Sequence, residues 1–225
     1  GWEMSDAGEG KGDGYDDFLI GAGGDEENGA AAGQAYLIFG KASGWSMDTD
    51  LSNADASFWG ESAGDMAGTY TAAAGDVNGD GYDDFLVNSP NDDDGGDNAG
   101  QTYLIFGQAS GWSMDTNLST ADASFWGEDA TDYSGMSIST AGDVNGDGYD
   151  DFLIAAVGDD DGGDSAGQVY LILGKATGWS MDTDLSNADA SFWGEEAGDG
   201  IGGSLSEAGD VNGDGYDDFL INSRL

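Results

Sequence analysis

The chain has 225 residues, of which 46 are Asp or Glu and only 4 are Lys or Arg, so its formal net charge is −42. A surface with this much negative charge repels a polyanion and an anionic membrane, which excludes nucleic acid and anionic lipid as partners. The chain has no Cys and no His, which excludes disulfides, a thiol nucleophile, an imidazole base and a zinc site. With 38% hydrophobic residues and 7 Trp, it is more apolar than a disordered acidic tail.

A repeat of 67 residues organises the chain. The string AGDVNGDGYDDFL begins at Ala74, Ala141 and Ala208, and a weaker copy, AGEGKGDGYDDFL, begins at Ala7. The strings GWSMD and ASFWGE recur at the same spacing. We therefore predict tandem copies of one structural unit, at residues 1–67, 68–134 and 135–201, followed by a partial fourth copy at 202–225.

Each unit is predicted to be all β. In the second unit, short apolar runs at Gly68–Ala74, Phe85–Asn88, Gln101–Phe106 and Ala123–Gly127 are separated by Gly, Asp and Asn, and no helical periodicity is present. Four short strands per unit predict tandem four-stranded antiparallel blades of the β-propeller type. Because propellers close with ~4–8 blades and 225 residues hold about 3.4 units, we expect that one chain does not close a ring.

Aromatic residues recur at fixed positions of the unit. In the second copy they are Tyr103, Phe106, Trp112, Phe125 and Trp126. Regular aromatic positions are typical of a core, so we expect these side chains to pack between sheets rather than to stack on carbohydrate.

The loop DVNGDGYDD carries the chemistry. Its oxygen donors stand at positions 1, 3, 5 and 9, with a backbone carbonyl available at position 7: Asp76, Asn78, Asp80, Asp84 and Tyr82. Calcium accepts 6–8 oxygen ligands in irregular geometry, so this spacing predicts a calcium site. Gly79 and Gly81 permit the positive φ angles that turn the backbone toward an ion.

Two more loops are intact and one is degenerate. The corresponding intact positions are Asp143, Asn145, Asp147, Tyr149 and Asp151, and Asp210, Asn212, Asp214, Tyr216 and Asp218. In the first copy they are Glu9, Lys11, Asp13, Tyr15 and Asp17. Because Lys11 replaces the Asn and can take over part of the electrostatic role of an ion, we expect weak or absent metal binding there.

An EF-hand shares the opening DxNxDG but needs a bidentate Glu at position 12 and a helix on each side. Position 12 is Val87, Ile154 or Ile221, inside a strand-like run. The pattern therefore disfavours an EF-hand.

Two other acidic clusters recur with the period. The first is NDDDGGD from Asn91 and GDDDGGD from Gly158, with the weaker GDEENGA from Gly24. We interpret it as a solvated hairpin tip, with a second calcium site as the alternative. The second is MDTDLSNAD from Met47, where Asp48 and Asp55 are expected to cap a turn or, alternatively, to bridge an ion.

A short strand, a DxNxDGxxD loop, an apolar run and then YLIFG resemble the FG-GAP repeat, the calcium-binding blade of the integrin α-subunit β-propeller. The resemblance covers essentially the whole chain. Trp59-Gly60 and Asn88-Ser89-Pro90 match its FG and GAP positions, although the second signature is degraded at Gly21, Ala155 and Asn222.

The resemblance implies a non-catalytic, calcium-binding, extracellular or cell-surface module for adhesion or protein–protein assembly. Paired carboxylates can serve glycoside hydrolysis, but here every candidate repeats with the unit instead of occurring once in a cleft. The alternative is a structural subunit or segment of an extracellular fibre or sheath, built by units that join across chains. Expected partners are other copies of the chain or adjoining repeats, and an extracellular protein or glycan ligand.

Overall fold

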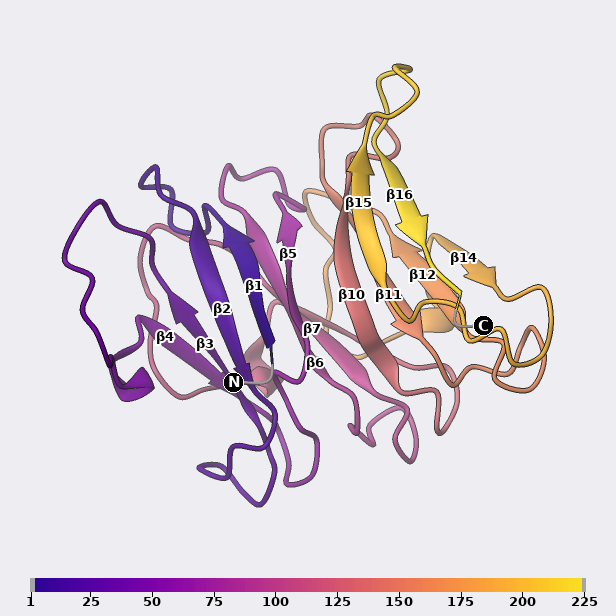
Figure 1. The fold of residues 1–225 in the computed structure, drawn as a ribbon, viewed down its shortest axis with the longest axis horizontal. Coiled ribbons are helices and arrows are strands. Elements are labelled where there is room, and N and C mark those ends of the chain that lie inside the picture. The colour runs from indigo at the N-terminus through magenta and orange to yellow at the C-terminus, as the bar shows by residue number, and fades with distance from the viewer. Residues whose placement is uncertain (1–2, 224–225) are drawn as a thin grey trace.

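The computed structural model describes residues 3–223, and these form three sheets and a terminal hairpin that stand side by side (Figure 1). The first sheet contains β1 (Glu3–Gly8), β2 (Asp17–Ala22), β3 (Gln34–Ile38) and β4 (Ala56–Trp59). The second contains β5 (Thr71–Gly75), β6 (Asp84–Ser89), β7 (Gln101–Ile105) and β9 (Ala123–Trp126). The third contains β10 (Ser134–Gly142), β11 (Asp151–Ala156), β12 (Gln168–Ile172) and β14 (Ala190–Trp193), and the hairpin is β15 (Leu205–Gly209) with β16 (Asp218–Ile221).

Neighbouring strands in each of these sheets pair antiparallel in chain order. In the second sheet, for example, Leu86 of β6 lies opposite Ala72 of β5 and Leu104 of β7. The four strands predicted for the second unit are therefore confirmed, with ends that differ by a few residues. The sheets do not close: β1–β4 and the β15–β16 hairpin lie at opposite ends of the molecule (Figure 1).

The first and second sheets each have a fifth strand, which was not predicted. It lies at the edge of the sheet, parallel to the fourth strand. β8 (Thr116–Asn117) pairs with β4, and β13 (Thr183–Asp184) pairs with β9. Both belong to the segment that follows the third strand of one sheet and crosses back to the fourth strand of the preceding sheet. We call residues 44–50, 111–117 and 178–184 the return segments.

Each return segment leads into a 3-10 turn, at Leu51–Asn53, Leu118–Thr120 and Leu185–Asn187. The predicted turn is confirmed, but the side chain that caps it is Asp50, not Asp48, and it accepts a hydrogen bond from the Ser52 N–H. Asp55 accepts instead from the Phe39 N–H, at 2.9 Å.

The core lies between the sheets, as the aromatic positions predicted. Trp112 of the second return segment stacks on Phe85, with ring centroids 6.0 Å apart, and meets Phe58 and Phe39 of the first sheet edge-on. Trp179 repeats this arrangement one sheet further along, on Phe152, Phe125 and Phe106. The second and third return segments thus each fasten their own sheet to the preceding one.

No helix within residues 3–223 has the length and apolarity that crossing a membrane requires.

Candidate metal centre

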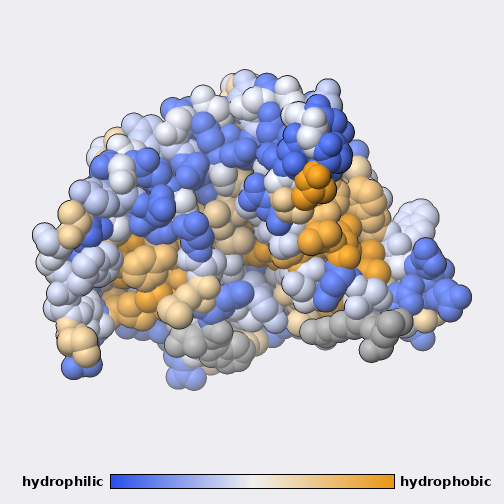
Figure 2. Space-filling model, turned by 45° about the horizontal axis from the view of Figure 1, so that its top comes forward, coloured by the Kyte–Doolittle hydropathy of each residue, from blue (hydrophilic) through white to orange (hydrophobic). Residues whose placement is uncertain are grey.

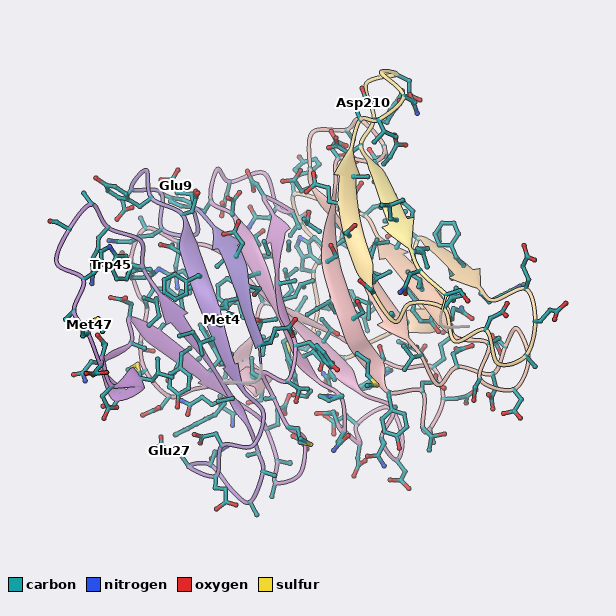
Figure 3. The ribbon with its side chains drawn as sticks, viewed as in Figure 1. Met4, Glu9, Glu27, Trp45, Met47 and Asp210 are labelled. Atoms are coloured by element: carbon teal, nitrogen blue, oxygen red, sulfur yellow. The ribbon has the colours of Figure 1, made fainter. Side chains whose placement is uncertain are left out.

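Four loops connect the first and second strands of the three sheets and the hairpin, at residues 9–17, 76–84, 143–151 and 210–218. They project from one edge of the molecule, where Figure 3 labels Glu9 and Asp210, whereas Glu27 lies at the opposite edge. Val87, Ile154 and Ile221, at the EF-hand position 12, lie in β6, β11 and β16, so the structure excludes an EF-hand.

The first Asp of each intact loop holds the loop backbone. One carboxylate oxygen of Asp76 accepts the N–H groups of Gly79 and Asp80, at 2.7 and 3.0 Å, and the other accepts the Gly81 N–H at 2.9 Å. Asp143 and Asp210 make the same bonds in their loops. The φ angles of Gly79 and Gly81 are 75° and 91°, as the turn was expected to require.

The side chains at the third and fifth loop positions also accept hydrogen bonds from the loop backbone. The Asn78 side-chain oxygen accepts the Asp80 N–H at 2.9 Å, and Asp80 accepts the Tyr82 N–H at 3.1 Å. Asn145 with Asp147, and Asn212 with Asp214, repeat both bonds. Asp80 and its counterparts stand exposed at the loop tips.

In two of the intact loops the ninth position is a buried carboxylate that forms no salt bridge among residues 3–223. Asp84 has no exposed surface, and its two oxygens accept the N–H groups of Gly107 and Val77 at 2.8 and 3.1 Å. Burial, together with the neighbouring carboxylates of Asp80 and Asp76, raises the pKa of Asp84 from 3.8 to about 8. The equivalent Asp151 is also buried, and its pKa rises to about 6. Asp218, in the terminal hairpin, is only partly buried.

Among residues 3–223, no three acidic side chains are grouped in a way that holds a metal ion. The predicted ligands lie on the same loop, but their carboxylates are bonded to N–H groups rather than converging on a centre. The donor set itself fits calcium, because every donor is an oxygen and one of the carboxylates is buried without a counter-charge.

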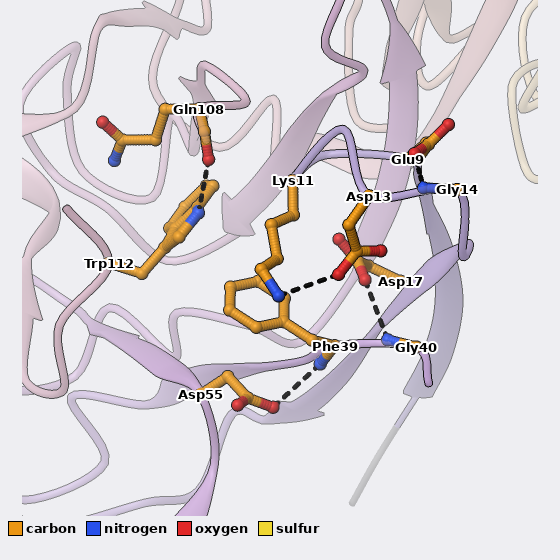
Figure 4. A network of polar contacts seen from close by, with 10 residues as sticks. All are labelled: Glu9, Lys11, Asp13, Gly14, Asp17, Phe39, Gly40, Asp55, Gln108 and Trp112. Atoms are coloured by element: carbon orange, nitrogen blue, oxygen red, sulfur yellow. Dashed lines mark hydrogen bonds and ion pairs between the residues drawn. The ribbon is translucent and has the colours of Figure 1, made fainter. Parts of the chain in front are cut away.

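The degenerate loop carries its own cation (Figure 4). The Lys11 ammonium lies 2.8 Å from an Asp13 oxygen and 4.9 Å from the centre of the Phe39 ring. The buried Asp17 accepts the Gly40 N–H at 2.8 Å, and burial raises its pKa to about 6. Glu9 accepts the Gly14 N–H. In the degenerate loop, Lys11 thus forms an ion pair with the Asp at the fifth position.

Sequence reasoning missed the eighth loop position, which links each loop to the preceding one. Asp150 accepts the N–H of Asp76 at 2.9 Å, and its own N–H donates to the Asp76 carbonyl at 3.2 Å. Asp83 and Asp217 accept in the same way from Glu9 and Asp143. The sequence did contain a signal for this link. All four copies have an Asp at the eighth position, in the first copy Asp16, although no role as a metal ligand explains it.

The acidic hairpin tips lie at the opposite edge, and the interpretation as a solvated turn was wrong for the second residue of two of them, Asp92 and Asp159. Asp92 is only 3% exposed and lies 3.1 Å from the Tyr103 hydroxyl, which is also 3.1 Å from Glu61. Burial raises the pKa of Asp92, and it raises the pKa of the nearby Asp65 to about 7. The sequence pattern could not reveal this, because Glu61 and Asp65 come from the end of the preceding repeat.

Comparison with known proteins agrees with the resemblance seen in the sequence. The FG-GAP repeat family model matches residues 68–105 and 134–172. Integrin alpha-IIb of Mus musculus is 34% identical over 158 residues, which cover 68% of this chain and 14% of that protein. Integrin alpha-PS2 of Drosophila melanogaster is 28% identical over 68% of this chain and 11% of its own length, and integrin alpha-4 of Xenopus laevis is 29% identical over 73% and 15%. The chain therefore spans only a small part of each of these relatives.

Proposed function

Because the chain carries FG-GAP repeats and is similar to integrin alpha subunits, we propose that it is a calcium-binding β-propeller-type module for adhesion or protein–protein assembly, outside the cell or at its surface. The proposed repeats are residues 1–67, 68–134, 135–201 and the partial copy 202–225. The module is non-catalytic, since the acidic candidates repeat with the unit instead of forming one unique site.

Three loops would hold calcium through side-chain oxygens and one backbone carbonyl each. The proposed ligands are Asp76, Asn78, Asp80, Tyr82 and Asp84; Asp143, Asn145, Asp147, Tyr149 and Asp151; and Asp210, Asn212, Asp214, Tyr216 and Asp218. The loop with Glu9, Asp13, Tyr15 and Asp17 would bind weakly or not at all, because the Lys11 ammonium repels a second cation. Bound calcium would offset two negative charges of each loop and tie the first two strands of each blade together.

The observation that carries this proposal is the buried Asp84 carboxylate beside Asp76 and Asp80, in a loop whose donors are all oxygens. An uncompensated buried carboxylate costs stability, and a divalent cation removes that cost. The three intact loops have the same sequence, so all three are expected to respond.

A second candidate function follows from the repetition of near-identical units along the chain. Such units can join across chains, which would make the protein a structural subunit or segment of an extracellular fibre or sheath. Its partners would then be other copies of the chain or adjoining repeats.

The calcium proposal is tested by titration calorimetry and by thermal unfolding in calcium, in magnesium and in excess chelator. We expect three calcium ions per chain and a clear fall in Tm on chelation that magnesium does not reverse. Asp147→Ala should remove one binding equivalent, whereas Asp13→Ala, at the same position of the degenerate loop, should leave the stoichiometry unchanged. An unchanged melt in chelator, or equal effects of the two substitutions, would contradict the proposal.

A further inference from the structure

We propose that the edge opposite the four loops holds a second kind of divalent-cation site, in which Glu61, Asp92 and Gln101 provide oxygen ligands between the first and second sheets. The third sheet carries the same residue types at the same positions. This inference goes beyond the proposed function, because none of these residues belongs to a loop that connects a first strand to a second. An ion bound there would join one sheet to the next.

Tyr103 brings two carboxylates together. Its hydroxyl lies 3.1 Å from an oxygen of Glu61, in the segment that joins the first sheet to the second, and 3.1 Å from an oxygen of Asp92, in the β6–β7 connection. A phenol hydroxyl carries one proton and can donate it to only one of the two acceptors. The other carboxylate receives no proton from the hydroxyl, so it needs a proton of its own or a cation.

A buried amide oxygen on the same strand has no partner. Gln101 has no exposed surface, and because it lies two residues before Tyr103 on β7, both side chains are on one face of the strand. Its amide nitrogen donates to the Ser124 hydroxyl at 2.7 Å and to an Asp182 oxygen at 3.3 Å. An ionised carboxylate can only accept, so the amide oxygen is turned away from Asp182. No group within residues 3–223 donates a hydrogen bond to that oxygen.

The first sheet shows where this oxygen points. The equivalent Gln34 also directs its amide nitrogen to an Asp of the following return segment, Asp115, at 3.2 Å. Its amide oxygen accepts the hydroxyl proton of Tyr36 at 3.0 Å. In the second sheet the Tyr103 hydroxyl lies against the carboxylates instead, so the Gln101 oxygen faces the hydroxyl without receiving its proton.

Three oxygen acceptors thus share a single proton and carry two negative charges. Within residues 3–223 the one salt bridge joins Lys11 to Asp13 at the other edge, and Lys41 and Lys175 lie over Trp rings. Buried acceptors without donors cost free energy. A divalent cation removes that cost, because it takes all three oxygens as ligands and balances both charges.

The cluster is open to solvent on one side, so an ion can enter. Glu61 is partly exposed and the neighbouring Asp94 stands exposed. Burial, reinforced by the charges of Asp94 and Asp92, raises the pKa of Glu61. Ligands that are all oxygens favour calcium, and water would complete its coordination. With two carboxylates instead of the three among the proposed ligands of an intact loop, this site binds more weakly than the loops do.

The third sheet repeats the arrangement. The Tyr170 hydroxyl lies 3.1 Å from an oxygen of Asp159, and Glu128 is a second hydrogen-bond acceptor of that hydroxyl. The Gln168 amide oxygen is buried and has no donor within residues 3–223. We therefore expect two such sites in the chain.

The test is calorimetry with calcium alone, continued above the concentration that fills the loops. Figure 2 shows hydrophilic residues over much of the edge that carries the loops, so about 0.15 M salt is needed to suppress diffuse binding to the acidic surface. We expect two weaker ions beyond the three of the loops, with dissociation constants of about 10⁻⁴–10⁻³ M. Glu61→Gln should remove one weak ion. Glu195→Gln, at the same position of the third unit where the side chain stands exposed, should remove none.

Thermal unfolding separates a ligand from a residue with a purely structural role. In excess chelator, Glu61→Gln should melt at or above the Tm of the parent, because an amide can donate to the oxygens that a carboxylate repels. At high calcium it should melt below the parent, because one stabilising ion is lost. The side-chain amide resonance of Gln101 should shift in the weak phase of the titration in the parent and not in Glu61→Gln.

The outcomes distinguish this proposal from the loop sites. A lower Tm of Glu61→Gln in both conditions, a Gln101 resonance that does not respond to calcium, or equal effects of Glu61→Gln and Glu195→Gln would each overturn it. Three bound ions alone would refute these sites and leave the loop sites standing. Two weak ions without a tighter class would support these sites and refute the loop sites.

Discussion

Trp179 and Trp45 occupy the same position in two return segments, and substituting each by Ala isolates the contribution of contacts between sheets. Their local contacts match: the indole N–H donates to the Lys175 or Lys41 carbonyl, at 2.8 and 3.0 Å, and the ammonium of the same lysine lies 4.7 Å from the ring centre in both cases. Each Trp also packs on the first Phe of the second strand in its own sheet, Phe152 or Phe18.

Of these two Trp residues, Trp179 alone contacts a preceding sheet among residues 3–223. Its ring meets Phe125 and Phe106 edge-on, at 6.4 and 6.1 Å, whereas Trp45 is 55% exposed. Each aromatic pair contributes roughly 0.5–1.5 kcal/mol beyond the area that it buries. We therefore expect Trp179→Ala to lower the free energy of unfolding by about 2 kcal/mol more than Trp45→Ala does.

The measurement is urea unfolding followed by far-UV circular dichroism, which does not depend on Trp fluorescence. It should be made at low protein concentration, so that association does not contribute. Unchanged m-values would indicate that both variants unfold from similarly compact states. Equal losses for the two substitutions, within about 0.5 kcal/mol, would refute the idea that the return segments fasten one sheet to the next.

Two further predictions concern the acidic groups. Burial raises the pKa of Asp65 to about 7 in the folded chain, above its usual 3.8, so its contribution to stability is complete below about pH 4 and is lost as the pH rises through 7. Melting curves of Asp65→Asn should therefore lose less stability between these pH values than the parent does, and an unchanged slope would contradict this reasoning. Asp150→Ala removes the acceptor of the Asp76 N–H and should destabilise the chain by roughly 1.5–3 kcal/mol and weaken calcium binding by the preceding loop. Asp16→Ala, whose side chain accepts no hydrogen bond from another loop among residues 3–223, should do neither, and equal effects of the two would show that the link between loops is unimportant.

The sequence by itself determined the strands and the loops. Short apolar runs bounded by Gly and Asp specify where the backbone extends and where it turns, and these preferences act within a few residues. The exact period then predicts that whatever one unit forms, the next unit forms again. The antiparallel order of each sheet, the positive φ angles of Gly79 and Gly81 and the aromatic core between sheets were predictable for this reason.

Only the tertiary structure decided how the units contact one another. Asp150 bonds to Asp76, 74 residues away, and Thr116 pairs with Phe58 of the preceding sheet. Asp92 is buried because Glu61 and Asp65 of the preceding repeat lie beside it. No local pattern encodes such contacts, since they arise when two folded sheets are brought face to face. The repeated sequence therefore determines each blade, whereas the packing of neighbours determines which acids are buried, which Trp residues contribute to stability and which faces remain open.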